Sequence, residues 1–434
     1  MATVLSATVV NVALHDIMVE FGIRQGQVHW LATGFIAAMT TIMLASSWLL
    51  DHFGVRKTLA WAMTGFTLIS IAGGYALSPE QLIAARVGQG AMAGLMQPMG
   101  MFLVFHIFPR NRRGQAMGIY GMGVILAPAL GPVLGGFLVD QLNWRYVLFA
   151  PAPVTLVGVM MAWRFLPLPV SRPAPYRFDL PGLVLLGMAI VLSLDTLNRL
   201  QDIAGQQARI LAGAVFALGF VVLFVIRERR ALHPLVNISL LKTPVFLFAN
   251  LGALALGLAL FGSTYLIPLF VQTSLGFSAT EAGLLMLPAG LVLGMTFPLA
   301  GRLADRQSAR SLVLFGIAVF ACSAVLFALS DQDLGFAWLA LWTVLGRIGI
   351  GFMLPALSVA ALNPLTQEQL AAGSSTISFT RQLGGAFGVN LVALSIEFGE
   401  HQGGIPTITA FHNAWWLIAG FVSLAMVAVW KMRE

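Results

Sequence analysis

Three arginines interrupt long apolar stretches of this sequence. Arg86 lies in LIAARVGQG, Arg347 in GRIGIG and Arg381 in SFTRQLGG. A charged side chain deep in a membrane helix costs about 2.5–3.5 kcal/mol on insertion scales, so such residues face a protein interior or an aqueous cavity. We therefore expect all three to face inward, where they could bind an anionic group or help to move a proton. For Arg86, a side chain that reaches the lipid headgroups is the alternative.

Carboxylates are the second group that could do chemistry, because they can carry protons across a membrane. Asp195 lies four residues from the end of an apolar stretch, whereas Asp16, Glu281 and Glu397 lie close to stretch ends. For the last three, a solvated helix end is the plainer interpretation. Asp195, Asp16 and Glu281 are the candidate proton sites, and no carboxylate is expected near the middle of the core helices.

Other chemistries lack their motifs. The sequence contains no G-x-x-x-x-G-K-[ST], G-x-S-x-G or H-E-x-x-H, its seven histidines are scattered, and Cys322 is its one cysteine. Basic residues are spread over many short loops and form no patch. We predict no enzyme activity, no cofactor, no metal site and no nucleic-acid partner.

The elements that position the charged residues are membrane helices. Of the 434 residues, 58% are hydrophobic and 9% charged, against roughly 25% charged in soluble proteins. Uninterrupted apolar runs indicate an all-α integral membrane protein. We predict fourteen spans, near 2–18, 27–50, 57–77, 81–105, 115–138, 146–166, 181–199, 209–227, 245–272, 281–300, 311–330, 336–361, 371–397 and 408–430.

Lysine and arginine predict the orientation, since they are enriched in cytoplasmic loops. Between these spans, seventeen of them fall on one side and only Arg24, Arg145, Arg199 and Arg209 on the other. This places both termini in the cytoplasm, which agrees with an even number of spans.

Two pairs of segments indicate an internal repeat. LLDHFGVRK (49–57) resembles GRLADRQSAR (301–310), and ARVGQG (85–90) resembles GRIGIG (346–351). The offsets are nearly equal, 305 − 51 = 254 and 347 − 86 = 261. We predict two six-helix parallel-repeat halves, residues 1–166 and 245–434, separated by two extra transmembrane helices within 167–244.

Several segments resemble the major facilitator superfamily, and specifically its fourteen-helix drug:proton antiporter branch. They are ATVVNVAL (7–14), the turns at 47–57 and 301–306, LIAARVGQG, GIYGMGVILAPALGPVLGG (118–136), WRYVLF (144–149) and FDLPG (178–182). The resemblance implies a major-facilitator fold in a bacterial cytoplasmic (inner) membrane. It implies proton-coupled multidrug efflux by alternating access and, in some relatives, a periplasmic adaptor and an outer-membrane channel.

The sequence departs from the family pattern at four positions. The first-span Asp of the family falls at Ser6, the Pro that follows that signature is His15, and the first-half turn has Ser47 and His52 in place of Gly and Arg. Because the missing carboxylate is implicated in handling protons or cations, the departure at Ser6 weakens the expectation of proton coupling.

The segment 118–136 contains six glycines and two prolines in one uncharged run. Gly123, Ala127, Gly131 and Gly135 recur every four residues and share one helix face, where another backbone can approach closely. The resemblance implies that this helix forms a bent, water-excluding contact between the two halves, with Gly136 and the prolines contributing. Ordinary small-residue packing is the alternative. The two prolines are Pro128 and Pro132.

The repeated turn has a mechanical interpretation. Asp51 could accept backbone N–H groups and pair with Arg113, which would hold the cytoplasmic ends together. A helix-capping Asp in a basic loop is the alternative. The residues assigned to this gating motif are Asp51, Gly54, Arg56, Lys57, Arg113, Asp305 and Arg306.

A substrate pocket is expected between the halves at mid-depth, with adaptable apolar and amide side chains. Lipid contact or simple packing is the alternative for each residue. The candidates are Asn11, Trp30, Gln89, Met92, Met96, Gln97, Tyr265, Gln272 and Phe379.

Three functions stay open on the sequence. The first is proton-driven efflux of amphipathic drugs. The second is transport of a narrower anionic or zwitterionic substrate, such as a fatty or organic acid, suggested by Ser6 and the three arginines. The third is a sensor or assembly subunit that binds without transport.

Overall fold

The structure is a computed structural model that describes residues 2–23, 25–166, 177–200, 206–331, 334–399 and 407–432. These residues are helical, and no strand occurs among them. The first group of helices is α1 (Ala2–Phe21), α2 (Gln25–Ile42), α3 (Ala45–Gly74), α4 (Pro79–Ile107), the short 3₁₀ helix η1 (Arg110–Arg112), α5 (Arg113–Gln141), α6 (Arg145–Phe149) and α7 (Ala152–Phe165). Next come α8 (Leu180–Arg199) and α9 (Gln207–Arg230). The last group is α10 (Ile238–Leu241), α11 (Pro244–Thr273), α12 (Ala279–Ala304), α13 (Ala309–Ala328), α14 (Phe336–Leu362), α15 (Leu370–Glu397) and α16 (Thr407–Trp430).

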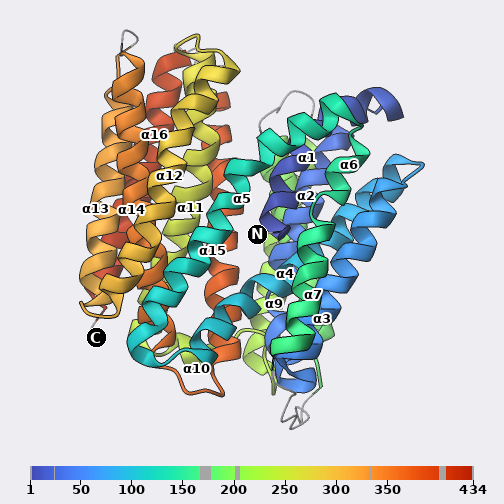
Figure 1. Cartoon of the computed structure of the whole chain (residues 1–434), viewed down its shortest axis with the longest axis vertical. Helices are drawn as coiled ribbons and strands as arrows, with labels where there is room; N and C mark the ends of the chain where they lie inside the picture. The colour runs from blue at the N-terminus through green and yellow to red at the C-terminus, as the bar shows by residue number, and fades with distance from the viewer. Residues whose placement is uncertain are drawn as a thin grey trace.

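Two bundles lie side by side. In Figure 1, α11–α16 lie at left, α1–α4 with α6 and α7 lie at right, and α5 runs obliquely from the upper end of one bundle to the lower end of the other. Accordingly α5 packs against α1 and also against α12. We call residues 1–166 the first half and 245–434 the second half, in keeping with the predicted boundaries.

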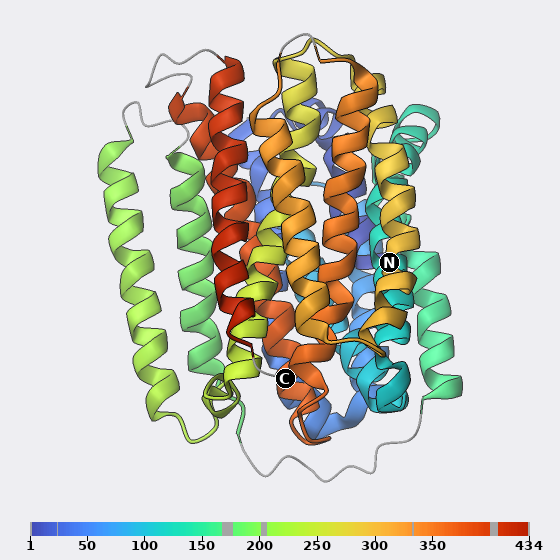
Figure 2. The ribbon, with the colours of Figure 1, turned by 90° about the vertical axis from the view of Figure 1, so that its left-hand side faces the viewer.

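The helices α8 and α9 stand outside this pair of bundles. They pack on each other, and α8 contacts α2 of the first half and α15 of the second. Figure 2 shows them in green at the left edge of the molecule. Most side chains of α9 are exposed, so its apolar surface is available to lipid.

Local sequence explains where several helices start. Ser78 caps α4 by accepting the N–H of Gln81, with Pro79 in the first turn. At α12, Ser278 and Glu281 cap each other's backbone reciprocally.

Two features of the first half differ from prediction: one span predicted as continuous is bent, and one predicted turn lies inside a helix. The predicted span 27–50 is bent by 65° between α2 and α3, near Thr40 and Thr41, whose hydroxyls bond the carbonyls of Ile36 and Ala37. The predicted turn at 50–57 is a kink inside α3, where Gly54 has φ 76°, a conformation that favours glycine.

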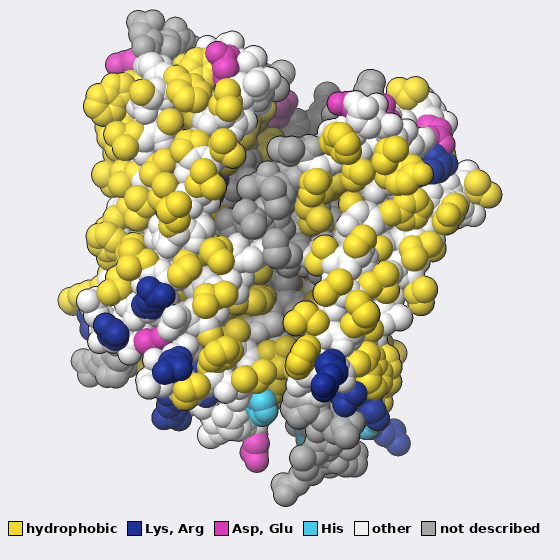
Figure 3. Space-filling view, in the orientation of Figure 1, with side chains coloured by type: hydrophobic (Ala, Val, Ile, Leu, Met, Phe, Trp, Pro, Cys, Tyr) yellow, Lys and Arg dark blue, Asp and Glu magenta, His cyan; other side chains and the backbone are white. Residues whose placement is uncertain are grey.

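The helices suit a membrane. Within the described residues, nine are long and apolar enough to span one, and two bent helix pairs would raise that number to eleven. The count of fourteen is therefore not confirmed and stays a prediction. In Figure 3, apolar side chains cover the middle of the molecule and lysines and arginines gather at its lower end. We call this lower end, where Arg112, Arg302 and Lys431 lie, the basic end.

Candidate functional site

The two halves are joined at the basic end by the carboxylate of Asp305. Its Oδ1 accepts the backbone N–H of Gly114 at 2.6 Å and its Oδ2 that of Gln115 at 2.8 Å. These amides lie in the first turn of α5, where N–H groups lack helical partners and favour a negative charge. Asp305 thus caps a helix of the other half.

Backbone contact reinforces this junction. Gly114 of α5 and Gly301 of α12 lie so close that a Cβ at either position would overlap the carbonyl oxygen of the other. Side-chain pairs continue the contact: Arg113 Nη1 donates to Asn363 Oδ1 at 3.1 Å, and His106 Nδ1 lies 3.1 Å from Gln367 Oε1. We call this set of contacts the basic-end seal. At the opposite end, Figure 3 shows the molecule hollowed between its halves.

The expected pairing of Arg113 with Asp51 is wrong in this structure. Arg113 donates to Asn363 and to the carbonyl of Phe108, because it starts the helix that crosses to the second half. The first-half turn lies apart from this contact, with Asp51 and Lys57 exposed and the guanidinium of Arg56 4.8 Å from the Trp163 ring centre. In the second-half turn, Arg306 is exposed.

The glycines of 118–136 divide between two partners. Gly131 and Gly135 face Thr8 and Val9 of α1, so the outer part of this face packs within the first half. The close approach to the second half is made nearer the basic end, where Gly118 faces the backbone of Phe297. The expected contact between halves is therefore displaced toward the start of α5.

The rest of that segment adds little to this contact. Gly123 is partly buried, and nothing lies within 4 Å of a Cβ built on Gly136. The side chains of Ala127, Pro128 and Pro132 lie outside the described residues.

Arg86 is held by a fixed polar network. It is 1% exposed, and its Nε donates to Leu31 O at 3.1 Å while Nη1 donates to Ser6 Oγ at 3.0 Å and Gln89 Oε1 at 2.9 Å. Gln89 in turn donates to Ser70 Oγ at 2.8 Å. The guanidinium therefore faces the interior of the first half, and its hydrogen-bond acceptors are all neutral.

Arg347, at the equivalent position of the repeat, is held more lightly. It is 4% exposed and donates to Ser263 Oγ at 3.3 Å and to Thr264 Oγ1 at 3.0 Å. Both hydroxyls already donate to carbonyls of their own helix, α11.

Arg381 is buried without such partners. It lies on α15 and is 8% exposed, and within the part of the chain that the structure describes no hydrogen bond is made by its guanidinium. Its charge interacts with Tyr120 of α5. The Tyr120 hydroxyl donates to the backbone oxygen of Gln97 on α4 at 3.1 Å, and the side-chain Oε1 of Gln97 is buried without a partner. These three residues come from both halves.

The candidate proton sites lie away from these arginines. Asp195 pairs with Arg199 at 2.7 Å, one turn further along α8, and Glu281 belongs to the capping box of α12. Asp16 is partly buried on α1, and Glu397 is the last residue of α15.

Three of the predicted pocket residues do come together. Met92 and Met96 of α4 and Phe379 of α15 pack on an apolar cluster that includes Phe35 and Phe66. This cluster joins the two halves through flexible and aromatic side chains.

The other predicted pocket residues are dispersed. Gln89 belongs to the Arg86 network, Trp30 is partly buried and Tyr265 is 39% exposed. Gln272 is exposed one residue before α11 ends and donates to Pro268 O of its own helix, so its expected mid-depth position is wrong. The side chain of Asn11 lies outside the described residues.

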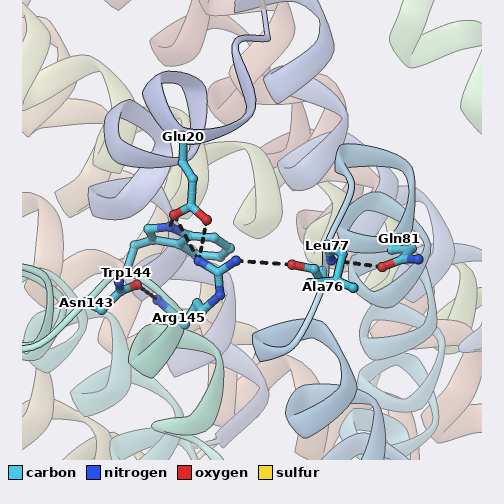
Figure 4. A network of polar contacts seen from close by, with 7 residues as sticks. All are labelled: Glu20, Ala76, Leu77, Gln81, Asn143, Trp144 and Arg145. Carbon is cyan, nitrogen blue, oxygen red and sulfur yellow. Dashed lines mark hydrogen bonds and ion pairs between the residues drawn. The ribbon is translucent and has the colours of Figure 1, made fainter.

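Sequence reasoning assigned no role to a network at the opposite end from the seal. Arg145 Nη1 lies 2.6 Å from Glu20 Oε1, its Nη2 donates to Ala76 O at 3.2 Å, and Trp144 Nε1 also donates to Glu20 (Figure 4). The network ties α1, the end of α3 and the start of α6. Trp144 and Arg145 stand in the quoted segment WRYVLF, but no residue pattern marked Glu20 as their partner.

Comparison with known proteins gives consistent matches along the chain. A family model described as the Major Facilitator Superfamily matches residues 1–389. The multidrug resistance protein B homolog of Mycobacterium tuberculosis is 31% identical over 90% of this chain and 73% of its own. The multidrug export protein EmrB of Escherichia coli is 31% identical over 89% of this chain and 76% of its own.

Solved structures share the fold. The human organic anion transporter MFSD10 (TETRAN) superposes with a TM-score of 0.68 at 15% identity, over 99% of this chain and 97% of its own. The proton:xylose symporter XylE gives a TM-score of 0.67 at 15% identity, over 100% of this chain and 94% of its own. At such identities the similarity concerns the fold alone.

Proposed function

The chain belongs to the major facilitator superfamily and is a multi-pass membrane transporter; on this premise we propose that it exports amphipathic drugs, driven by a proton gradient. The observation that carries the proposal is the 31% identity, over 89–90% of the chain, to two bacterial proteins named for multidrug export or resistance. A third relative, the multidrug transporter protein MdtP of Bacillus subtilis, is 28% identical over 89% of the chain.

The geometry supports transport by alternating access. The basic-end seal joins the halves at one end, and the molecule is hollowed between them at the other. Separation of α5 from α12 at Asp305 would open the basic end, while the helices on either side could move as rigid bodies. From the positive-inside rule we infer that the basic end faces the cytoplasm of a bacterial inner membrane.

The apolar cluster supports drugs as substrates. Met92, Met96 and Phe379 meet where the halves join, and methionine side chains adapt to ligands of different shape. Because the cluster contains side chains of both halves, its packing changes as the halves separate. Such a cluster suits a binding site that is accessible from each side of the membrane in turn.

The test uses everted membrane vesicles that hold an imposed pH gradient. Addition of ethidium or tetraphenylphosphonium is expected to dissipate the gradient in vesicles that contain the protein and to leave it unchanged in vesicles without it. A Gly301→Val variant, which places a side chain against the Gly114 carbonyl, is the matched control and is expected to bind ethidium without moving protons.

Two results would separate the parts of this proposal. Accumulation of the drug inside the vesicles without proton movement would support drug efflux and contradict proton coupling. If folded protein produced neither drug accumulation nor proton movement, drug export would be contradicted. An Asp195→Asn variant tests whether the proton site lies in α8, and co-purification tests a periplasmic adaptor with an outer-membrane channel.

A further inference from the structure

Arg381 is a buried cation that the protein leaves without a hydrogen-bonding partner in its described part. The arginine is only 8% exposed, and its backbone is fixed because its carbonyl oxygen abuts Gly257 of α11. A buried charge is normally paired or hydrogen-bonded, since removal from water is costly. A guanidinium with no hydrogen bond to the described residues keeps its donors available for an anion.

The surroundings of Arg381 offer further polar groups. Tyr120, whose hydroxyl interacts with the Arg381 charge, packs its ring against Gly100 of α4. Gln97 has a buried side-chain amide whose oxygen lacks a partner. The planar guanidinium and the Gln97 amide N–H group together can donate to both oxygens of a carboxylate, and the single Tyr120 O–H would join them by turning away from Gln97 O.

These groups lie above the basic-end seal. At 1.5 Å per residue, Arg381 is about 16 Å from the start of α15, Gln97 about 15 Å from the end of α4 and Tyr120 about 10 Å from the start of α5. All three of those helix ends are at the basic end, so the groups lie at comparable depth between the two halves.

The apolar cluster involves the same segments of α4 and α15 as these polar groups. Met96 precedes Gln97 on α4, and Phe379 is two residues before Arg381 on α15, and both pack on the cluster. The same segments of α4 and α15 therefore carry both the polar groups and the cluster side chains, at the same depth.

The other two buried arginines, unlike Arg381, donate hydrogen bonds to neighbouring residues. Arg86 donates to Leu31, Ser6 and Gln89, and Arg347 donates to Ser263 and Thr264. Of these three buried arginines, only Arg381 has a guanidinium that donates no hydrogen bond within the described residues.

We propose that Arg381, Tyr120 and Gln97 bind the carboxylate of an amphipathic organic acid, at the depth of the Met96 and Phe379 cluster. The inference rests on the proposed transport function and defines a substrate class within it. The ligand joins α4 and α5 of the first half to α15 of the second, so it is bound by residues that separate or approach as the halves move.

The test measures binding to purified protein in lipid nanodiscs by isothermal titration calorimetry. The probes are 1-naphthaleneacetate and its neutral amide, 1-naphthaleneacetamide, which share the ring system and differ in charge. Wild-type protein is expected to bind the acid at least about tenfold more tightly than the amide, as hydrogen bonds to a charged group contribute roughly 1.5–3 kcal/mol.

Variants locate the site. Arg381→Gln is expected to bind the acid and the amide with equal affinity, and Arg381→Lys to retain part of the preference for the acid. Tyr120→Phe is expected to bind the acid a few-fold more weakly and the amide as wild type does. Arg164→Gln, at the exposed end of α7, is the control and is expected to behave as wild type. Gel filtration and thermal melting establish that each variant is folded.

Several outcomes would overturn the proposal. They are equal wild-type affinities for acid and amide, an unchanged preference in both Arg381→Gln and Tyr120→Phe, or a preference lost only in Arg347→Gln. Because the assay needs no transport, its failure would leave drug export intact, and failure of the vesicle assay would leave the anion site intact.

Discussion

Arg86 and Arg347 occupy equivalent positions in the two copies of the repeat, yet they are held in different ways. Arg86 binds a backbone carbonyl, a serine and a glutamine, and its guanidinium lies 4.3 Å from the Phe35 ring centre. Arg347 binds two hydroxyls that are already bonded to their own helix. The first arginine is part of a network of several acceptors, whereas the partners of the second have hydrogen bonds of their own that do not depend on it.

The repeated turn differs between the halves in the same manner. Asp305 caps α5 of the other half, while the first-half copy contains the Gly54 kink and an exposed Asp51. A repeat therefore preserves the residue type and its depth, and the neighbouring helix decides what that residue does. This difference can be tested by making the same change in both copies.

The largest expected effect comes from Arg86→Met. This change leaves Gln89 Oε1 buried without its donor, at a cost of about 1–3 kcal/mol, and also removes the bonds to Leu31 O and Ser6 Oγ. We expect the free energy of unfolding to fall by about 3 kcal/mol, measured by thermal melting in detergent. Arg347→Met is expected to lose less than about 1 kcal/mol, because its hydroxyl partners keep their own bonds. Equal losses of unfolding free energy in the two variants would show that the two arginines are held equally firmly.

An intermediate effect is expected from Asp305→Asn. The variant removes the charge that accepts the Gly114 and Gln115 amides, an interaction of roughly 1.5–3 kcal/mol. Amide hydrogen exchange at the start of α5, followed by mass spectrometry, should speed up at least about tenfold. Asp51→Asn is the matched change in the first half and should leave hydrogen exchange at the start of α5 unaltered. If both variants gave the same acceleration, the cap would not be specific to Asp305.

The smallest effect concerns the outer part of the Arg86 network. Ser70→Ala removes the acceptor of Gln89 Nε2 and is expected to lower the free energy of unfolding by about 1 kcal/mol. In an Arg86→Met background the same change should have a smaller effect, since Gln89 is then already free to rearrange. Strictly additive losses would show that the two bonds are independent.

Much of the fold could be predicted from the sequence. Apolar runs placed the helices, and the turn expected at 50–57 is the kink at Gly54, because only a glycine there accepts a positive φ readily. The bend between α2 and α3 was missed, because threonine hydroxyls bond carbonyls in straight helices as well.

The site could be predicted in part. Asp305 was identified from its repeat, but its partners are backbone amides, which carry no signature in the sequence. The small-residue face at Gly131 and Gly135 was visible, although nothing in its spacing told that α1 is its neighbour. The depth of Arg381 was inferred from its helix, whereas its lack of partners depends on what the other helices place beside it.

The contact between Gly114 and Gly301 has a consequence for engineering the protein. Here two main chains touch with no side chain between them, so a single methyl group would act as a wedge. Gly114→Ala or Gly301→Ala would hold the helices apart by a fixed amount that no rotamer can relieve. Either substitution would keep the basic end partly open. Such a variant could be used to capture ligands that enter from that side.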